Sequence, residues 1–291
     1  MSHIQLSNKY ISASISPKGA ELRSLRRADS GREYMWSGDP AHWDRVSPTL
    51  FPIVGRLHND AYTWQGRRYS LPQHGFARDL EFDVVHEDGT CASFLLGSAG
   101  PFLERYPQQF QLALTYSLDS EALILRYDVF NPSNSDDLLF SLGAHPAFRW
   151  PLDESIPADA HTLQFERSET ADRLEVGTDA LLTGRKVPFF RDMDHIKLRP
   201  DLFRAGAIVL EGVKSDSVVF GTEDGPRVRL TAPSAPWWAF WTMPSAPFLC
   251  LEPWHGIADK HGADWDLRGK PGMIALPPGE SWSWTLKIEP S

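Results

Sequence analysis

Cysteine is scarce in this sequence, which contains only Cys91 and Cys250 among 291 residues. Both lie within short apolar segments, which favours two reduced, buried thiols over a disulfide-stabilised scaffold or a catalytic cysteine. The chain also lacks an apolar stretch approaching the roughly 20 residues that span a bilayer. Its first residues lack the charged start and apolar run of a signal peptide. We therefore expect a cytoplasmic protein.

Positive charge is scarce as well, because 29 lysines and arginines stand against 38 aspartates and glutamates and give a net charge of −9. Nucleic acids and anionic membranes both bind basic surfaces, whose cations replace condensed counterions or contact acidic headgroups. The composition therefore argues against nucleic acid and membrane as partners and favours a small neutral ligand. It leaves open whether the protein is a monomer or a homodimer.

Sustained helical periodicity is absent, whereas alternation of apolar and polar residues recurs along the chain. It is clearest over 110–118 and 123–129, which a short polar break joins into an antiparallel hairpin, and over 282–288. Frequent turns are supplied by 23 prolines and 21 glycines. Shorter strands are expected at 10–15, 81–86, 92–96, 207–210, 217–220, 228–231, 237–241 and 247–251.

These patterns predict an all-β fold, an antiparallel sandwich with few short helices, in which one face of each sheet is buried. Residues 1–291 are expected to form a single domain, since no repeat or linker divides them and large all-β domains reach roughly 200–250 residues. The segment 153–204 has the weakest strand signal. We expect it to form a long excursion over one edge of the sandwich.

Three short, turn-like motifs carry the residues suited to acid–base chemistry: Gln73-His74-Gly75, Ala144-His145-Pro146 and Leu251-Glu252-Pro253. A carboxylate and an imidazole on opposite sides of a substrate can remove a proton at one atom and donate one at another. Glu252 ends an apolar run, where a charge is costly unless it faces a polar cavity or a partner, so desolvation should raise its pKa. For each histidine the alternative is a structural role with hydrogen bonds to the protein. For Glu252 the alternative is a solvent-exposed position at the end of a strand.

Two arginines and a tryptophan complete the candidate site. Arg56 follows a segment stiffened by two prolines and a glycine, and its planar guanidinium suits the hydroxyl groups of a ligand. Arg78 lies four residues after His74, and Trp254 lies beside Glu252 in a region rich in aromatic residues. Such rings stack on apolar sugar faces but also form ordinary core. The aromatic residues of this region are Trp237, Trp238, Phe240, Trp241, Trp254 and Trp265.

The order of the motifs Val54-Gly55-Arg56, His74 to Arg78, Gly143 to Pro146 and Leu251 to Trp254 resembles the aldose 1-epimerase (mutarotase) superfamily, in particular its LacX-like branch. The resemblance implies a galactose mutarotase-like β-supersandwich that interconverts the α and β anomers of a free hexose without a cofactor or metal. It also implies roles for individual residues. Glu252 would be the base at the C1 hydroxyl and His145 the acid at the ring oxygen, with His74 assisting and Arg56 binding hydroxyls.

The sequence departs from the family pattern at one position. Many relatives have a sugar-binding aspartate where this chain has Gly206, so the identity of the sugar is open. Three nearby residues are candidates to replace it: Asp192, Asp194 and Asp201. Arg56 and Arg78 together would suit a phosphate, which leaves a hexose-6-phosphate mutarotase as an alternative.

Three other functions are considered from the residue types. A carbohydrate-binding protein without catalysis would need the aromatic residues but neither Glu252 nor His145. A metal site at His74, His145 and Glu252 has suitable ligand types, but the spacing of a helical metal-binding motif is missing. A glycosidase would need a second carboxylate, and only Glu252 is a convincing candidate.

Overall fold

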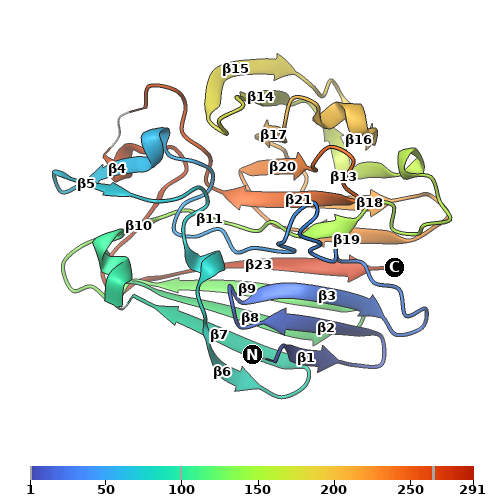
Figure 1. Ribbon diagram of the computed structural model, residues 1–291, viewed down its shortest axis with the longest axis horizontal. Coiled ribbons are helices and arrows are strands. Elements are labelled where there is room, and N and C mark those ends of the chain that lie inside the picture. Colours follow the sequence, from blue (N-terminus) through green and yellow to red (C-terminus); the bar gives the residue numbers. More distant parts are fainter. Residues whose placement is uncertain (1, 99, 264–265) are drawn as a thin grey trace.

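The computed structural model describes residues 2–98, 100–263 and 266–291, and within them the chain contains no α-helix (Figure 1). The prediction of an all-β fold with few short helices is confirmed. None of the helical segments described has the length and apolar character needed to cross a membrane. They are single 3-10 turns: η1 (His58–Asp60), η2 (Ala77–Asp79), η3 (Gly100–Glu104), η4 (Ala158–Ala160), η5 (Pro200–Phe203) and η6 (Leu267–Gly269).

The larger of the two main sheets has nine antiparallel strands. Its centre is formed by the segments with the clearest alternation, and the register brings Leu114, Tyr127 and Trp284 into one buried row. In sheet order the strands are β16 (Met193–Lys197), β13 (Thr162–Glu169), β18 (Ser217–Gly221), β19 (Arg227–Thr231), β23 (Ser281–Pro290), β9 (Ala122–Phe130), β8 (Gln111–Asp119), β7 (Cys91–Gly97) and β6 (Asp83–Glu87).

The second main sheet has seven antiparallel strands and lies at the top of Figure 1. Two short strands, β11 (Leu142–Gly143) and β12 (Ala147–Arg149), pair with successive parts of one long strand, β21 (Phe248–His255). The remaining strands follow in the order β20 (Trp237–Trp241), β17 (Ile208–Glu211), β14 (Asp172–Val176) and β15 (Leu182–Pro188).

Alternation along β20 decides which face of the seven-stranded sheet meets the core. Trp238 and Phe240 are fully buried, and Phe240 contacts Phe165 of the nine-stranded sheet with ring centroids 5.8 Å apart. Ala239 lies between them in the sequence and therefore faces the other way. The face of Phe240 joins the two main sheets, whereas the face of Ala239 carries the candidate site described below.

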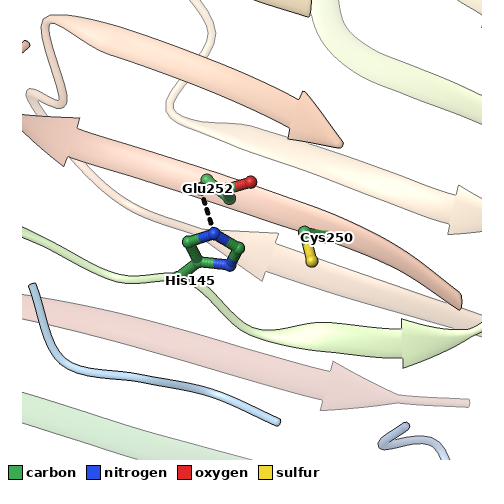
Figure 2. Close-up of side chains that lie close together, drawn as sticks. All are labelled: His145, Cys250 and Glu252. Atoms are coloured by element: carbon green, nitrogen blue, oxygen red, sulfur yellow. Dashed lines mark ion pairs between the residues drawn. The ribbon is translucent and has the colours of Figure 1, made fainter. Parts of the chain in front are cut away.

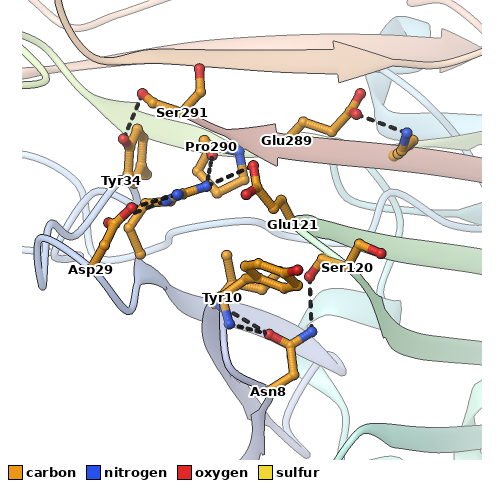
Figure 3. Close-up of polar contacts among 12 residues, drawn as sticks. Asn8, Tyr10, Asp29, Tyr34, Ser120, Glu121, Glu289, Pro290 and Ser291 are labelled. Atoms are coloured by element: carbon orange, nitrogen blue, oxygen red, sulfur yellow. Dashed lines mark hydrogen bonds and ion pairs between the residues drawn. The ribbon is translucent and has the colours of Figure 1, made fainter.

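Three smaller sheets complete the fold. One has the order β1 (Ile4–Ser7), β2 (Ile11–Ser16), β3 (Glu21–Arg27), and the other two pair β4 (Ala61–Trp64) with β5 (Arg67–Ser70) and β10 (Leu138–Phe140) with β22 (Ile274–Leu276). The three-stranded sheet contacts β7, β8 and β23. Polar contacts fix it there (Figure 3): Tyr34 donates to the Ser291 carbonyl at 2.8 Å, and Arg27 pairs with Glu121 at 3.0 Å.

The segment 153–204 is more regular than the sequence indicates, because it contains four strands, β13 to β16. They do extend the edges of the sandwich: β13 and β16 end the nine-stranded sheet, and β14 and β15 end the other. The outermost strands are largely exposed, and β15 has no buried residue. A strand without a buried face carries no apolar alternation, which explains its weak sequence signal.

The segment after β21 is fixed by a buried ion pair between Lys270 and Asp259, whose Nζ and Oδ1 atoms are 3.4 Å apart. Lys270 also donates to the Ile257 carbonyl, and the other oxygen of Asp259 accepts from the His58 backbone N–H at 3.0 Å. The Asp259 N–H donates to the carbonyl of Arg56 at 2.9 Å. The pair therefore holds the segment after β21 against the chain that carries Arg56.

We predict that Lys270→Ala lowers the free energy of unfolding by about 3–5 kcal/mol, because it leaves a buried carboxylate without its cation. The double variant Lys270→Met/Asp259→Asn should lose less than Lys270→Ala, since it removes both charges and keeps an acceptor for His58. Urea unfolding of the wild type, Lys270→Ala, Lys270→Met, Asp259→Asn and the double variant measures these differences. Simple additivity of the single losses would contradict this account of the pair.

Candidate active site

Glu252 lies in the middle of β21 and not at the end of a strand, because the strand continues to His255. Proline normally interrupts a central strand, since it lacks the N–H that a ladder needs. The Pro253 carbonyl accepts from Ala144 N at 3.1 Å, so the missing N–H faces the irregular segment between β11 and β12. Pro253 is tolerated there, and β21 keeps its full ladder with β20.

The Glu252 carboxylate is 2% exposed and pairs directly with His145, with Oε2 and Nε2 2.9 Å apart (Figure 2). Burial raises the pKa of Glu252 above its usual value of 4.5, and the charge and hydrogen bond of His145 oppose the rise. The expected desolvation of this carboxyl group is therefore confirmed. The expected picture of the two groups on opposite sides of a substrate is wrong, because they lie side by side.

A side-by-side arrangement has a clear chemical use. The hydroxyl oxygen and the ring oxygen of a cyclic sugar are both bonded to C1, so they are separated by a single bond angle. A base for one oxygen and an acid for the other can therefore lie next to each other. The 2.9 Å contact between Glu252 and His145 has this form.

His145 belongs to the segment 144–146 that bridges β11 and β12 opposite Glu252. Hydrogen bonds to β21 fix both ends of the segment: Ala144 donates to Pro253, and Leu251 N donates to the Pro146 carbonyl at 3.0 Å. The position directly before this segment requires glycine, because a Cβ at Gly143 would lie 2.6 Å from Trp254 Cδ1. The backbone therefore sets the position of the imidazole.

Aromatic rings enclose the His145 imidazole. Trp43 lies against it at a centroid distance of 5.1 Å and a 33° interplanar angle, and Trp241 meets it edge-on at 6.0 Å. The two indoles also contact each other at 5.4 Å. Trp241 belongs to the aromatic region that the sequence reveals, whereas Trp43 lies alone in a loop and carries no sequence pattern.

His74 lies next to the Glu252–His145 pair, with its ring centroid 5.8 Å from that of His145 and 6.2 Å from that of Trp254. His74 and Gly75 both have positive φ, 65° and 70°, and a Cβ at Gly75 would lie 2.2 Å from the Phe51 carbonyl oxygen. The Gly55 N–H donates to His74 Nδ1 at 3.1 Å. Burial, helped by the charges of His145 and two arginines, holds the pKa of His74 well below 6.5, so its ring is neutral.

Both predicted arginines are engaged by protein groups. Arg56 donates from Nε and Nη2 to both oxygens of Asp60, at 2.7 and 2.8 Å, and from Nη1 to the Asp179 carbonyl at 3.1 Å. Arg78 is largely buried, donates to the Gln73 carbonyl at 2.6 Å, and has its pKa lowered to about 10, chiefly by desolvation. Arg56 thus binds a carboxylate through two of its nitrogens, whereas the buried Nε of Arg78 has no hydrogen-bond partner among the described residues.

Trp254 shares the site face of β21 with Cys250 and Glu252, since alternate residues of a strand point the same way. It is 6% exposed and belongs to an apolar cluster with Val209, Ala239 and Ile257, among others. Trp265 lies outside the residues that the structure describes. The candidate replacements for the aspartate lie elsewhere: Asp192 and Asp194 flank the start of the edge strand β16, and Asp201 in η5 pairs with Arg199.

A metal site was an alternative for His74, His145 and Glu252. The potential ligand atoms that converge, within 4.8 Å of one another, are those of His145, Cys250 and Glu252 (Figure 2). Burial and the negative charge of Glu252 raise the pKa of the Cys250 thiol well above 9.0. Cysteine binds metal ions as a thiolate, so a thiol that keeps its proton is poorly suited to be a metal ligand.

Three comparisons bear on the identity of the chain. The sequence model of the family described as aldose 1-epimerase matches residues 2–289. The chain is 30% identical to the chromosomal protein LacX of Lactococcus lactis over 284 residues, which cover 94% of this chain and 95% of that protein.

Two solved structures are similar over almost the whole chain. A galactose mutarotase related enzyme from Lactobacillus acidophilus has 33% identity and a TM-score of 0.94, with 99% of this chain and 97% of that chain covered. A galactose mutarotase-like protein from Lactobacillus casei has 29% identity and a TM-score of 0.93, with 99% and 100% covered. The predicted galactose mutarotase-like fold is confirmed.

We predict that Glu252→Gln stabilises the protein progressively, relative to wild type, as the pH rises above 4.5. A carboxyl whose pKa is raised by folding retains its proton in the folded state at pH values where the unfolded chain has lost it. The wild type therefore loses stability as the pH rises from the pKa of Glu252 in the unfolded chain to its raised pKa in the folded protein. The glutamine variant has no carboxyl group to titrate at this position. Urea unfolding at several pH values checks this, with the same change at the exposed Glu104 as control. A difference between wild type and variant that stays constant with pH would refute it.

Proposed function

The chain belongs to the aldose 1-epimerase family, and from this premise we propose that it is a mutarotase. It would interconvert the α and β anomers of a free hexose without a cofactor. The observation that supports this most strongly is the buried contact between the Glu252 carboxylate and the His145 imidazole. The pair matches the spacing of the two oxygens on the anomeric carbon.

The proposed reaction begins when Glu252 removes the proton from the C1 hydroxyl. Electrons from that oxygen form the aldehyde C=O as the bond between C1 and the ring oxygen breaks, and His145 protonates the departing ring oxygen. Rotation about C1–C2 presents the other face of the carbonyl group. Closure then reverses the roles: His145 takes a proton back as the ring oxygen attacks C1, and Glu252 returns a proton to the new hydroxyl.

The environment of the pair supports this division of roles. A carboxylate with a raised pKa is a stronger base near neutral pH, and the adjacent imidazole is oriented by Glu252 itself. Since His74 accepts a backbone N–H at Nδ1, the proton of its neutral ring lies on Nε2, which is 3.3 Å from the side-chain amide of Gln73. Trp254 would contribute an apolar surface for the ring.

The phosphorylated alternative receives less support. A phosphate would require guanidinium groups with donors available for bidentate binding. Arg56 already spends three donors on Asp60 and Asp179, and Arg78 is buried against Gln73. We therefore favour a free sugar. A carbohydrate-binding protein without catalysis would bind a hexose without raising its rate of mutarotation.

Replacement of either member of the pair should remove most of the activity. We expect Glu252→Gln and His145→Asn each to lower the mutarotation rate of a free hexose by about 10²–10⁴-fold, the usual contribution of one proton-transfer group. Polarimetry of freshly dissolved α-glucose and α-galactose measures the rate. Glu169→Gln is the matched control, because Glu169 is a buried glutamate held by Ser215 on the other sheet. Wild-type rates in either site variant would refute the assignment.

The substrate preference gives a separate test. We expect kcat/KM for glucose or galactose to exceed that for glucose 6-phosphate by at least about tenfold, because Arg56 already binds the Asp60 carboxylate and Arg78 is largely buried. Polarimetry or anomer-specific NMR on the same enzyme preparation measures both. Preference for the phosphorylated sugar, lost in Arg56→Ala or Arg78→Ala, would establish the alternative.

A further inference from the structure

Gln73 and His74 occupy the two central positions of a tight turn beside the candidate site. The Gly75 N–H donates to the Pro72 carbonyl at 2.9 Å and closes the turn. The Gln73 carbonyl accepts from Arg78 Nη2 at 2.6 Å, which fixes the turn against the chain that follows it. The two central side chains contact each other, because the Nε2 atoms of Gln73 and His74 are 3.3 Å apart.

The hydrogen bonds of His74 decide how the Gln73 amide is oriented. Nδ1 of His74 accepts the Gly55 N–H at 3.1 Å, so the single proton of the ring lies on Nε2. This N–H group faces the amide nitrogen of Gln73 at 3.3 Å. Two N–H donors cannot bond to each other, and turning a glutamine amide over exchanges its nitrogen and oxygen. The hydrogen bond therefore forms with the amide turned over, so that Oε1 of Gln73 accepts from His74.

In this orientation the NH2 group of Gln73 is the free end of a series of hydrogen bonds. Gly55 donates to His74, and His74 donates to Gln73. Within the part of the chain that the structure describes, no protein group bonds to the outer end of the amide. Gln73 is half-buried, and this outer atom is not among the buried polar atoms that lack a partner, so it reaches solvent. The NH2 group is therefore available to a ligand.

The neighbours of Gln73 place it relative to the groups proposed for catalysis. Glu252 contacts His145 at 2.9 Å, and the ring centroid of His74 lies 5.8 Å from that of His145. Among the described residues, no hydrogen bond or ion pair joins His74 directly to Glu252. The contacts therefore run in the order Glu252, His145, His74, Gln73.

A hexopyranose has a matching succession of groups along one edge. Its C1 hydroxyl is followed by the ring oxygen, then by C5 and the hydroxymethyl group at C6. With the C1 hydroxyl at Glu252 and the ring oxygen at His145, the C6 hydroxyl extends toward Gln73. The other neighbours of His145, Trp43 and Trp241, present aromatic rings, which suit C–H groups better than a hydroxyl group.

We propose that Gln73 recognises the C6 hydroxyl of the sugar, with its amide nitrogen donating to that hydroxyl while its amide oxygen accepts from His74. The proposal rests on the mutarotase function above and names hexoses with a free C6 hydroxyl as the substrate class. An amide N–H is a neutral donor, which suits a hydroxyl group. His74 then acts as a positioning residue, because its proton holds the amide in the orientation for donation.

Comparison of glucose with 6-deoxyglucose tests the contact, because these sugars differ only in the C6 hydroxyl. We expect the wild type to have a kcat/KM about three- to tenfold higher for glucose by polarimetry, the usual worth of one neutral hydrogen bond. Gln73→Met, which keeps the length of the side chain without its hydrogen-bonding groups, should bring the ratio close to one. Gln164→Met, at an exposed glutamine on β13, is the matched control and should leave the ratio unchanged. A wild-type ratio close to one would overturn the proposal.

Nitrogen NMR of the labelled wild type tests the amide orientation without any turnover. We expect the His74 ring to carry its proton on Nε2, and its Nε2 resonance to shift in Gln73→Met but not in Gln164→Met. A proton on Nδ1 would mean that the Gln73 nitrogen donates to His74 and is not available to the sugar. That result would overturn the proposal even if the variants were inactive.

Calorimetric titration of the Glu252→Gln variant with the same two sugars separates this proposal from the mutarotase function. Tighter binding of glucose than of 6-deoxyglucose, lost when Gln73→Met is added, supports the contact even if the wild type shows no mutarotation. Mutarotation of both sugars with equal kcat/KM and equal binding upholds the function and overturns the role of Gln73. Absence of both binding and turnover overturns both.

Discussion

The contact between the Glu252 carboxylate and the His145 imidazole is the interaction on which the arrangement of the site depends. Removing charged groups from water costs several kcal/mol per ion, and only a partner in good geometry offsets that cost. The surroundings supply this geometry. Two backbone hydrogen bonds join the segment 144–146 to β21, and Gly143 leaves room for Trp254. The pair is therefore held by the backbone of two strands and not by flexible side chains.

A second buried ion pair, Lys270–Asp259, performs the corresponding task on the other side of the site. Asp259 donates its N–H to the Arg56 carbonyl and accepts the His58 N–H at its carboxylate, and Gly55 in turn donates to His74. His74 is thus linked to the segment after β21 through the chain from Gly55 to His58 and its hydrogen bonds. Both ion pairs, Glu252–His145 and Lys270–Asp259, are buried, so disruption of either should affect stability and local geometry together.

The sequence predicts those strands that have one buried face and one solvent-exposed face. The strands β8, β9 and β23 follow from their alternation, and Glu252 is identifiable because a charge follows an apolar run. Edge strand β15 has no buried face and therefore leaves no pattern. The strand expected at 247–251 continues to His255, because only the tertiary structure reveals that the missing N–H of Pro253 faces an interrupted ladder. Trp43 was missed because its contact with His145 depends on a loop conformation.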